Sequence, residues 1–414
     1  MSDFPNEWKI TKVENMASVE RGKFSARPRN DPRYYGGKIP FVQTGDIREA
    51  NTFLEKYSQT LNDEGLSVSR LFPAETVFIT IAANIGDVAI TKFEVACPDS
   101  IVAVQANDDV SPYWLLYALE IQQPRLDYIA SQNAQKNINL KVLRPLKVLV
   151  PPLEEQKRIA AILGTWDSAI AQVEALVSAL ERRKKGLMQG LLTGEVRFAE
   201  FVESDEMQET RFGDIPADWD NVQLSDLFKR VRRKAGEDEL EVLSITAGTG
   251  FQTQEEKFGR IIAGKNLSNY IELHKGEFAY NKGNSNTYPQ GCVYLLEEYE
   301  RAAVPSVYYC FKSKDKNIEL RFYKHYFESG ALNKQLSTRI NTGVRNDGLL
   351  NLYVDDFFDV EILVPAKNEQ KHISHVLSKI DDELDIFQEY LICLREQKKG
   401  LMQRLLTGEI RVQV

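Results

Sequence analysis

One long helical pattern occurs twice in the sequence, and this duplication most constrains how the chain folds. Both copies end in the run Lys-Lys-Gly-Leu-Met-Gln-x-Leu-Leu-Thr-Gly-Glu, at residues 184–195 and 398–409. Near the start of the copies, Gln156 corresponds to Gln370, so the two copies stay 214 residues apart without a gap. We therefore expect two equivalent helices, over about 155–192 and 369–406, each roughly 38 residues and about 57 Å long.

Apolar residues in both copies recur in alternating steps of four and three over about five heptads. This spacing predicts the seam of a coiled coil rather than the broad apolar face of a surface helix. Lys184 and its counterpart Lys398 fill the polar position of the seam. The predicted seam residues are Ile159, Leu163, Trp166, Ile170, Val173, Val177 and Leu180 in the first copy, and Ile373, Leu377, Ile380, Leu384, Phe387, Leu391 and Leu394 in the second.

The seam pattern does not determine how the two helices are oriented. Because a globular segment separates the copies, the chain can return in either direction, and both parallel and antiparallel pairs remain open. A plain stalk, or two helices that each pack on their own domain, also fits the pattern.

The duplication extends into the residues before each helix. Phe4-Pro5-Asn6-Glu7-Trp8 opens the chain, and Ile215-Pro216-Ala217-Asp218-Trp219 opens the segment after the first helix. Each opening begins a globular stretch that ends in a short apolar strand and a proline, Pro151 or Pro365. We interpret Trp8 and Trp219 as core anchors. The predicted order is a first head (1–150), a central helical region (151–198), a linker with a second head (199–364) and a C-terminal helical region (365–414).

Both heads show mixed α and β patterns, which places the chain in the α+β class. In head 1 we expect strands at 39–42, 76–81 and 88–91 and a helix at 113–121. In head 2 we expect strands at 241–245, 277–280, 292–296 and 307–311 and a helix at 320–328. The order of elements is similar while the surface residues differ, which indicates two binding heads with different ligands.

Composition limits the class of protein. A length of 414 residues suits two or three domains, and 43% hydrophobic with 27% charged residues is typical of a globular protein. No apolar run could span a bilayer, no signal-like N-terminus is present, and four dispersed cysteines indicate free thiols in a reducing cytoplasm. The net charge of −8 argues against a nucleic-acid ligand, but net charge averages over surfaces that meet different partners.

Local runs of cations, amides and aromatic residues form candidate binding loops in both heads. Arg and Lys suit phosphates and guanine edges, whereas Asn and Gln suit adenine. The candidate DNA contacts are Arg27, Arg29, Asn30, Arg33, Tyr34, Lys38, Gln135, Lys136 and Asn137 in head 1, and Arg230, Arg232, Arg233, Lys282, Asn284, Arg339, Asn341, Arg345 and Asn346 in head 2.

Signals for catalysis are few. Residues 259–266 match a phosphate-binding loop except that Asn266 replaces the Ser or Thr that ligates magnesium. A nuclease or ATPase that uses Lys265 is therefore one alternative. His372 and His375 lie one helical turn apart, but the first copy has Arg158 and Ala161 there, so we interpret them as surface residues rather than metal ligands. We predict no catalytic residues and no metal site.

The repeated motifs resemble those of a known family. Each helical copy starts with a proline that is followed a few residues later by Glu-Gln-Lys-x-Ile, at residues 151–159 and 365–373, and ends with Lys-Lys-Gly-Leu-Met-Gln. These starts and ends are similar to the conserved regions of type I restriction-modification specificity subunits. The Pro-x-x-Trp openings and Tyr35-Gly36-Gly37-Lys38-Ile39-Pro40 are similar to the target-recognition domains of that family. Head 2 lacks this last sequence, which leaves its contacts less defined.

The resemblance implies a fold and a function. Each head would read one half of a bipartite, asymmetric site in double-stranded DNA, and two antiparallel helices would hold the heads at a fixed spacing, as a pseudo-twofold repeat. Two methyltransferase subunits and the restriction-translocase subunits would be the partners, and these would bring S-adenosylmethionine, ATP and magnesium. The chain itself would hold no cofactor and would be a cytoplasmic, non-catalytic subunit. The alternative is a coiled-coil scaffold or another two-headed DNA-binding adaptor.

Overall fold

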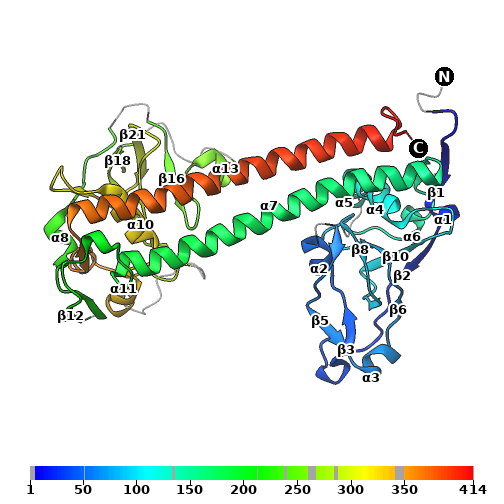
Figure 1. Cartoon of the computed structure of the whole chain (residues 1–414), viewed down its shortest axis with the longest axis horizontal. Helices are drawn as coiled ribbons and strands as arrows, with labels where there is room; N and C mark the ends of the chain where they lie inside the picture. Colours follow the sequence, from blue (N-terminus) through cyan, green and yellow to red (C-terminus); the bar gives the residue numbers. More distant parts are fainter. Residues whose placement is uncertain are drawn as a thin grey trace. The chain divides into compact units, whose positions relative to one another are not determined.

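The computed structural model describes residues 5–50, 52–132, 136–211, 213–236, 240–259, 267–283, 288–340 and 349–413. The chain forms two compact units: unit 1 contains residues 1–176 and 387–414, and unit 2 contains residues 177–386. Each unit combines one head with parts of two long helices, α7 (Leu153–Thr193) and α13 (Lys367–Leu406) (Figure 1). The two long helices of the predicted repeat are confirmed.

The base of head 1 is a five-stranded sheet in the order β2-β10-β7-β8-β4. Its strands are β2 (Ala17–Arg21), β10 (Ile101–Ala106), β7 (Val77–Thr80), β8 (Val88–Thr91) and β4 (Phe53–Leu54). Strands β7 and β8 are buried on both faces. Val77 and Ile79 point into the core beside α4 (Pro112–Glu120), whereas Phe78 points into a second core. This two-sided burial explains why these strands are continuous apolar runs.

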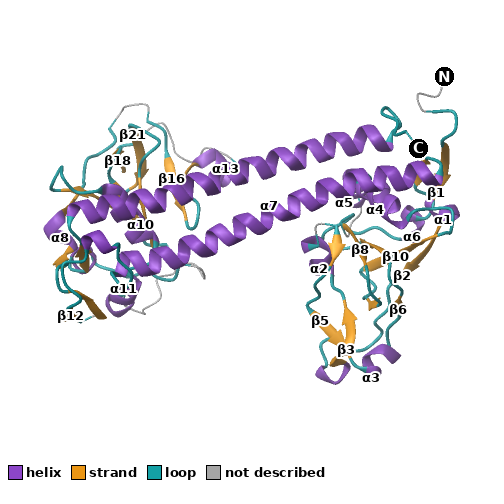
Figure 2. Cartoon of the chain, in the orientation of Figure 1, coloured by secondary structure: helices purple, strands orange, loops and turns teal. Residues whose placement is uncertain are grey.

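The rest of head 1 consists of short elements around this sheet (Figure 2). A second sheet has the order β5-β3-β9-β6, with β5 (Gln59–Leu61), β3 (Tyr35–Phe41), β9 (Val95–Ala96) and β6 (Leu71–Phe72). β1 (Lys9–Lys12) pairs antiparallel with β11 (Lys147–Val150). The short helices are α1 (Val13–Met16), η1 (Pro32–Tyr34), α2 (Thr44–Glu49), α3 (Asp63–Ser67), α5 (Gln123–Ser131) and α6 (Leu140–Leu143).

Head 2 repeats the base sheet of head 1. Its order is β15-β22-β19-β20, formed by β15 (Phe228–Arg230), β22 (Tyr309–Ser313), β19 (Phe278–Asn281) and β20 (Cys292–Leu295). Helices α10 (Leu320–Glu328) and α11 (Asn333–Arg339) follow β22 just as α4 and α5 follow β10. β14 (Asp220–Gln223) pairs with β23 (Glu361–Val364) as β1 pairs with β11. The internal repeat of the α+β fold is therefore present in four strands of the base sheet, in the two helices that follow and in the flanking strand pair.

The outer part of head 2 differs from that of head 1. It contains the hairpin β16 (Leu243–Thr246) and β17 (Gly250–Thr253), and the pair β18 (Tyr270–His274) and β21 (Arg301–Pro305). The remaining elements of the unit are η2 (Ala199–Phe201), β12 (Met207–Thr210), β13 (Gly213–Pro216), α8 (Leu224–Leu227), α9 (Gln254–Phe258) and α12 (Val354–Phe358). In both heads, the expected strands and helices are confirmed, with boundaries that shift by a few residues.

The two long helices run antiparallel. In unit 1, Lys398 Nζ lies 2.7 Å from Asp167 Oδ1, and Arg395 pairs with Glu174. Residue numbers therefore rise along α13 in the direction in which they fall along α7. In unit 2, Lys184 Nζ lies 2.6 Å from Asp381 Oδ1, which is the equivalent pair. The lysine that interrupts the apolar pattern of each helix therefore has an aspartate partner on the other helix. One such polar pair in a seam favours a single register.

The predicted seam residues are all buried or partly buried. Those nearest the heads also belong to the head cores: Ile159 and Leu163 lie in the core of head 1, and Ile373 and Leu377 lie in that of head 2. The far end of the other helix joins the same core, with Leu405 in head 1 and Leu191 in head 2. Each head core thus needs both helices.

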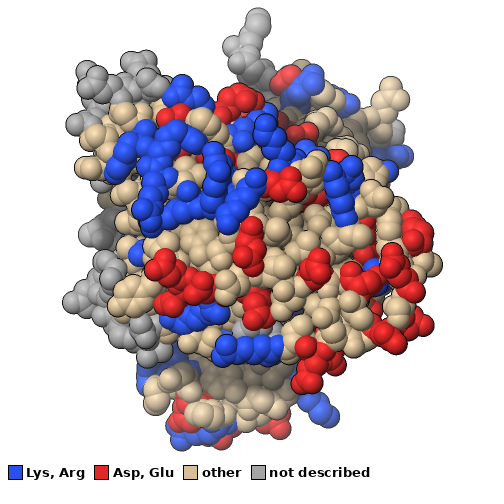
Figure 3. All heavy atoms as spheres, turned by 90° about the vertical axis from the view of Figure 1, so that its left-hand side faces the viewer, with Lys and Arg blue, Asp and Glu red and all other residues tan. Residues whose placement is uncertain are grey.

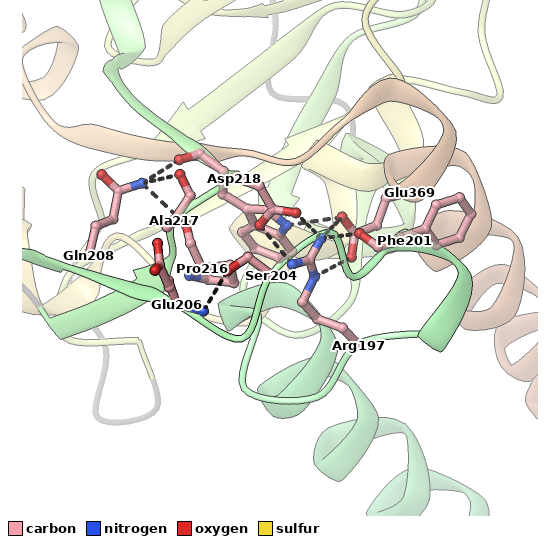
Figure 4. Close-up of polar contacts among 10 residues, drawn as sticks. Arg197, Phe201, Ser204, Glu206, Gln208, Pro216, Ala217, Asp218 and Glu369 are labelled. Atoms are coloured by element: carbon pink, nitrogen blue, oxygen red, sulfur yellow. Dashed lines mark hydrogen bonds and ion pairs between the residues drawn. The ribbon is translucent and has the colours of Figure 1, made fainter.

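A buried carboxylate closes each unit; we call each such site a carboxylate clasp. In unit 2, Glu369 is fully buried, and it accepts hydrogen bonds from Trp219 Nε1 at 3.0 Å and from Arg197 Nε at 2.8 Å (Figure 4). The same guanidinium also donates two bonds to Asp218. The hydrogen bonds to Glu369 are the main cause that raises the pKa of Arg197 above its usual range, and those to Asp218 add to it.

The clasp of unit 1 is built from equivalent residues. Trp8 Nε1 donates to Glu155 Oε2 at 2.9 Å, and Arg411 Nε donates to Glu155 Oε1 at 2.7 Å. Both tryptophans are nearly fully buried, which confirms their interpretation as core anchors. The neighbouring glutamines, Gln156 and Gln370, donate to the carbonyls of Pro151 and Pro365 and so fold the start of each long helix against its proline.

Breaking one clasp should destabilise its unit strongly. Glu369→Gln removes the charge that a nearly buried guanidinium faces, and such a loss costs about 3 to 5 kcal/mol. We expect the urea midpoint of Trp219 fluorescence to fall accordingly. Glu383→Gln, at an exposed position of the same helix, is the matched control. It should leave the free energy of unfolding within about 0.5 kcal/mol of the native value, and the midpoint nearly unchanged. Equal midpoints for both variants would contradict the role of the clasp.

A buried histidine gives unit 2 a specific dependence on pH. His325 of α10 is fully buried, its Nδ1 lies 3.8 Å from Asp381 Oδ2, and its Nε2 lies 3.3 Å from the hydroxyl of Ser378. Burial lowers its pKa to about 4, against the opposing effect of Asp381. In head 1 the equivalent residue is Tyr117, whose hydroxyl donates to Asp167 at 2.5 Å.

Because its pKa is lowered on folding, His325 should destabilise unit 2 as the pH falls from about 6.5 through 4. The free energy of unfolding should fall by about 2 kcal/mol at pH 5, because the unfolded chain binds a proton at this histidine that the folded chain excludes. Urea unfolding of native protein and His325→Gln at pH 7 and pH 5 measures this difference. The raised pKa of Glu328, about 7, acts in the opposite direction and is common to both proteins. A pH response that is equal in the two proteins would refute the assignment.

Candidate nucleic-acid interface

The candidate loops of head 1 meet at the turn before β10. Asp99 Oδ1 and Oδ2 accept from Arg29 Nη2 at 2.8 and 2.9 Å. The next residue, Ser100, accepts at its carbonyl from the backbone of Ile81, and the carbonyl of Ile81 accepts from Ile138. Loop 27–38 and the described residues 136–138, about a hundred residues apart in sequence, therefore lie at one end of the base sheet, which we call the candidate edge.

The cations of this edge are held in different ways. Arg27 Nη1 donates to the carbonyls of Phe24 and Ala26, so its guanidinium also shapes its own loop. Arg33 Nε lies 3.1 Å from Asp31, and Lys136 Nζ lies 3.0 Å from Asp127. All of these cations are exposed, and such surface ion pairs exchange readily for a phosphate because each is worth little in water.

Two candidate residues of head 1 differ in exposure: Lys38 is exposed, whereas Tyr34 is buried. Lys38 lies on β3 with an exposed side chain, and it forms no ion pair within the part of the chain that the structure describes. Tyr34 is buried against Phe24, and its hydroxyl accepts from Arg33 Nη2 at 2.6 Å. Tyr34 therefore positions Arg33 rather than presenting its ring. Asn30 is exposed, Asn137 bridges to Ala82, and Gln135 lies outside the described residues.

Two candidate residues of head 2, Arg230 and Lys282, lie beside Tyr309, the first residue of β22. The guanidinium of Arg230 lies 5.7 Å from the centre of the ring, and Lys282 Nζ lies 5.2 Å from it. The Tyr309 hydroxyl donates to the carbonyl of Leu352 at 2.5 Å, and Leu350 donates to the carbonyl of Lys282. Three segments that are distant in sequence thus bring two cations to the face of one aromatic ring.

The other candidates of head 2 have separate roles. Arg232 is exposed, and Arg233 donates two N–H groups to Glu277 at 2.9 and 3.0 Å. Arg339 Nη1 donates to the carbonyl of Asp356, which ties α11 to α12. Four further candidates, Asn284, Asn341, Arg345 and Asn346, lie outside the described residues.

The candidate edge occupies the same place in both heads. In head 1, Asn137 bridges to Ala82, just after β7; in head 2, Leu349 bridges to Gly283, just after β19. In each head a residue beyond the second helix, Asn137 or Leu349, therefore lies beside the end of the same base strand. Sequence reasoning missed Asp99 and Tyr309, which organise the two edges. Neither has a local signal, because the partners of each lie tens of residues away.

The alternative catalytic sites gain no support from the described residues. Gly259 ends α9 in a left-handed conformation, and the loop residues 260–266, including Lys265 and Asn266, lie outside the described part of the chain. His372 packs edge-on against Phe198 and Phe201, while His375 is exposed. Over the described ranges, no group of three His, Cys, Asp or Glu residues is placed to hold a metal.

Two of the four cysteines, Cys97 and Cys310, are buried. All four are free, and burial raises the pKa of Cys310 to about 12. A thiol that stays protonated is a poor nucleophile. A search of the described helices for a span long and apolar enough to cross a membrane finds none.

Comparison with known proteins agrees with this architecture. Residues 5–182 match the family model of the type I restriction modification DNA specificity domain. A Methanocaldococcus jannaschii protein, provisionally assigned as the specificity subunit of type I restriction enzyme MjaX, is 25% identical, with 100% of this chain and 96% of the relative aligned. The MjaVIII specificity subunit of the same organism is 23% identical over 99% of this chain and 94% of its own length.

Solved structures show the same fold. The type I restriction-modification S subunit from M. genitalium superposes with a TM-score of 0.58 at 14% identity, covering 98% of this chain and 97% of its own. A chain solved in work on complex assembly and conformational transition of the type I R-M system gives 0.56 at 14% identity, covering 99% and 100%.

These findings confirm the resemblance that the repeated motifs predicted. Residues 5–182 match the type I restriction modification DNA specificity domain, and along its whole length the chain is similar in sequence and fold to type I restriction-modification specificity subunits.

Proposed function

We propose that this chain is the DNA-sequence-recognition subunit of a type I restriction-modification system and carries no catalytic site of its own. The observation that carries the proposal is the repeated edge: both heads bring cationic side chains, Arg29 in head 1 and Arg230 and Lys282 in head 2, to the same end of the base sheet. The match to the specificity domain and the similarity to named specificity subunits support it.

Each head would read one half of a bipartite, asymmetric site in double-stranded DNA. Exposed cations such as Lys38 and Arg232 suit phosphate contacts, which set affinity and register on the duplex. Guanidinium groups that an aromatic ring or a carboxylate holds in place, such as Arg230 and Arg29, suit the bidentate recognition of a guanine edge. Because the two outer parts differ in sequence and topology, the two half-sites would also differ.

The helices would keep the two half-sites at a fixed separation. Half-sites about one helical turn of DNA apart lie on the same side of the duplex, so a rigid connection selects the number of unread base pairs between them. The Lys–Asp pairs of the seam, 2.6 and 2.7 Å long, hold each unit in one register and would make the spacing reproducible.

The remaining chemistry would belong to partner subunits in the cytoplasm. Two methyltransferase subunits would bind S-adenosylmethionine and modify adenine, and restriction-translocase subunits would use ATP and magnesium. The acidic excess of this chain, −8 in total, would then lie mainly on surfaces that meet these proteins or solvent.

Replacing a single phosphate-contacting lysine tests the DNA-binding edge of head 1. Lys38→Gln should weaken binding by a similar factor on every duplex and reduce the salt slope of log K by about 0.9, because one counterion fewer is released. The measurement is a titration of labelled duplex over a range of NaCl concentrations. Lys9→Gln, an exposed lysine on β1 of the same unit, is the matched control and should retain the native slope. If Lys38→Gln also retains the native affinity and salt slope, Lys38 does not contact DNA.

A map of methylated adenines tests the function as a whole. We expect the native host to lose one bipartite motif, modified once in each half, when this gene is deleted. Complementation with the gene should restore the motif, and it should fail with a frameshifted copy. If the set of methylated motifs is the same with and without the gene in a host that expresses it, a scaffold role would replace the recognition role.

A further inference from the structure

Two lysines face each other on the base sheet of head 2. Lys229 of β15 and Lys312 of β22 are direct cross-strand partners; Lys229 is exposed, and Lys312 is partly exposed. Like charges in this position repel and destabilise a sheet. Lys312 Nζ has only a long contact, 3.6 Å, to Glu277, and Lys229 has no ion-pair partner in the described part of the chain. The pair is therefore expected to destabilise the folded sheet.

Further cations surround the pair over two buried carboxylates. Arg233 binds Glu277 through two N–H groups, and Arg301 Nε lies 2.7 Å from Glu272. Both carboxylates are buried, whereas the four cations, Lys229, Arg233, Arg301 and Lys312, reach solvent. We call these four residues the cation cluster. The four cations carry two more charges than the two buried carboxylates, so the cluster is positive. His274, which also contacts Glu272, is not included in this sum.

One side of unit 2 carries a cationic area. Figure 3 looks onto a side of unit 2, and Lys and Arg side chains form one continuous group in the upper part of that face, with Asp and Glu mostly below and beside it. A continuous cationic area of this kind attracts polyanions and raises their local concentration.

Head 1 shows that the base sheet does not need these charges. The cross-strand pair at the equivalent place is Ser18 and Gln105, on β2 and β10. Both are uncharged, and Glu20 lies beside them, with its carboxylate near the hydroxyl of Ser18. The same strand order therefore forms with a neutral pair. A structural requirement of the fold does not account for the lysines of head 2, whereas an anionic ligand does.

We infer that the cation cluster binds the phosphate backbone of double-stranded DNA and is a contact that head 2 makes and head 1 lacks. The inference rests on the proposed DNA-binding function and extends it: the two heads contribute unequally to affinity. Glu272 and Glu277 hold the two arginines in place, and the two lysines supply charge that no protein group neutralises fully. Because backbone contacts carry no sequence information, head 2 would anchor the duplex in addition to reading its half-site.

The test is the salt dependence of binding by the full-length chain, with a random-sequence duplex as the probe. The double variant Lys229→Gln and Lys312→Gln should lower the slope of log K against log salt by about 1.8, which is about 0.9 for each lost phosphate contact. Its thermal midpoint should be at least that of the native chain, because a repulsion is removed. A fall in the midpoint would show that the lysines stabilise the sheet and would overturn the inference.

The chain offers a matched control. Lys12 and Lys147 are also direct cross-strand partners, on β1 and β11 of head 1, but Lys12 Nζ lies 3.3 Å from Glu14. Lys12→Gln with Lys147→Gln removes the same total charge and should leave the slope unchanged. An equal change of slope in both double variants would mean that net charge acts at long range, and it would overturn the inference.

The other outcomes separate this inference from the proposed function. If the native chain binds duplex with a steep salt slope and the Lys229 and Lys312 variant has the same slope, the cation cluster is not a DNA contact and the proposed function stands. If the native chain fails to bind duplex both alone and with its methyltransferase subunits, the proposed function itself is wrong. If DNA binding is unchanged but association with those subunits is lost, the cluster binds an acidic protein surface instead.

Discussion

The structure depends on a buried carboxylate that lies at the start of each long helix. Glu155 and Glu369 are removed from water, and a lone carboxylate in that position would be strongly unfavourable. Each is therefore satisfied by a tryptophan from the opening of its own head and by an arginine from the segment that follows the other helix. The three groups of each clasp come from distant parts of the chain, and in unit 1 they join its two separate segments, residues 1–176 and 387–414.

This requirement explains how the units are composed. The core of head 1 contains the beginning of α7 and the end of α13, and the core of head 2 contains the beginning of α13 and the end of α7. The lysine–aspartate pairs then set the antiparallel register within each unit. In an apolar seam, many registers would bury similar area, but an uncompensated lysine would penalise the wrong ones. The clasps and the seam pairs thus act together as positional constraints.

The two heads share what the fold needs and differ where a ligand can reach them. Four strands of their base sheets have the same order, and a residue beyond the second helix lies beside the same strand end in each head. Tyr117 and His325, at equivalent positions, both face the aspartate of the seam pair, although only the histidine makes its unit sensitive to acid. At the surface, a serine–glutamine pair in head 1 corresponds to a lysine pair in head 2. Such divergence on a common frame is what two different half-sites would require.

Much of the architecture could be predicted from the sequence, because its signals are local. The heptad spacing, the 214-residue repeat, the paired Trp motifs and the apolar strands of both heads are each a pattern of near neighbours, and the structure places them as predicted. The candidate loops were also recognisable by composition, but their arrangement was not. That Tyr34 is buried, that Arg233 is bound to Glu277 and that Arg339 ties two helices together could not be seen in the loops themselves.

The sequence by itself determined that the chain is a duplicated frame of two heads and two long helices. Only the tertiary structure decided which cations meet. Asp99 reaches Arg29 across 70 residues, Tyr309 lies beside both Arg230 and Lys282, and Lys229 faces Lys312 across two strands. The physical reason is that these contacts are made by strand pairing and loop return between remote segments. Residues that are separated in this way share no periodicity, so their proximity exists only after the sheet has formed.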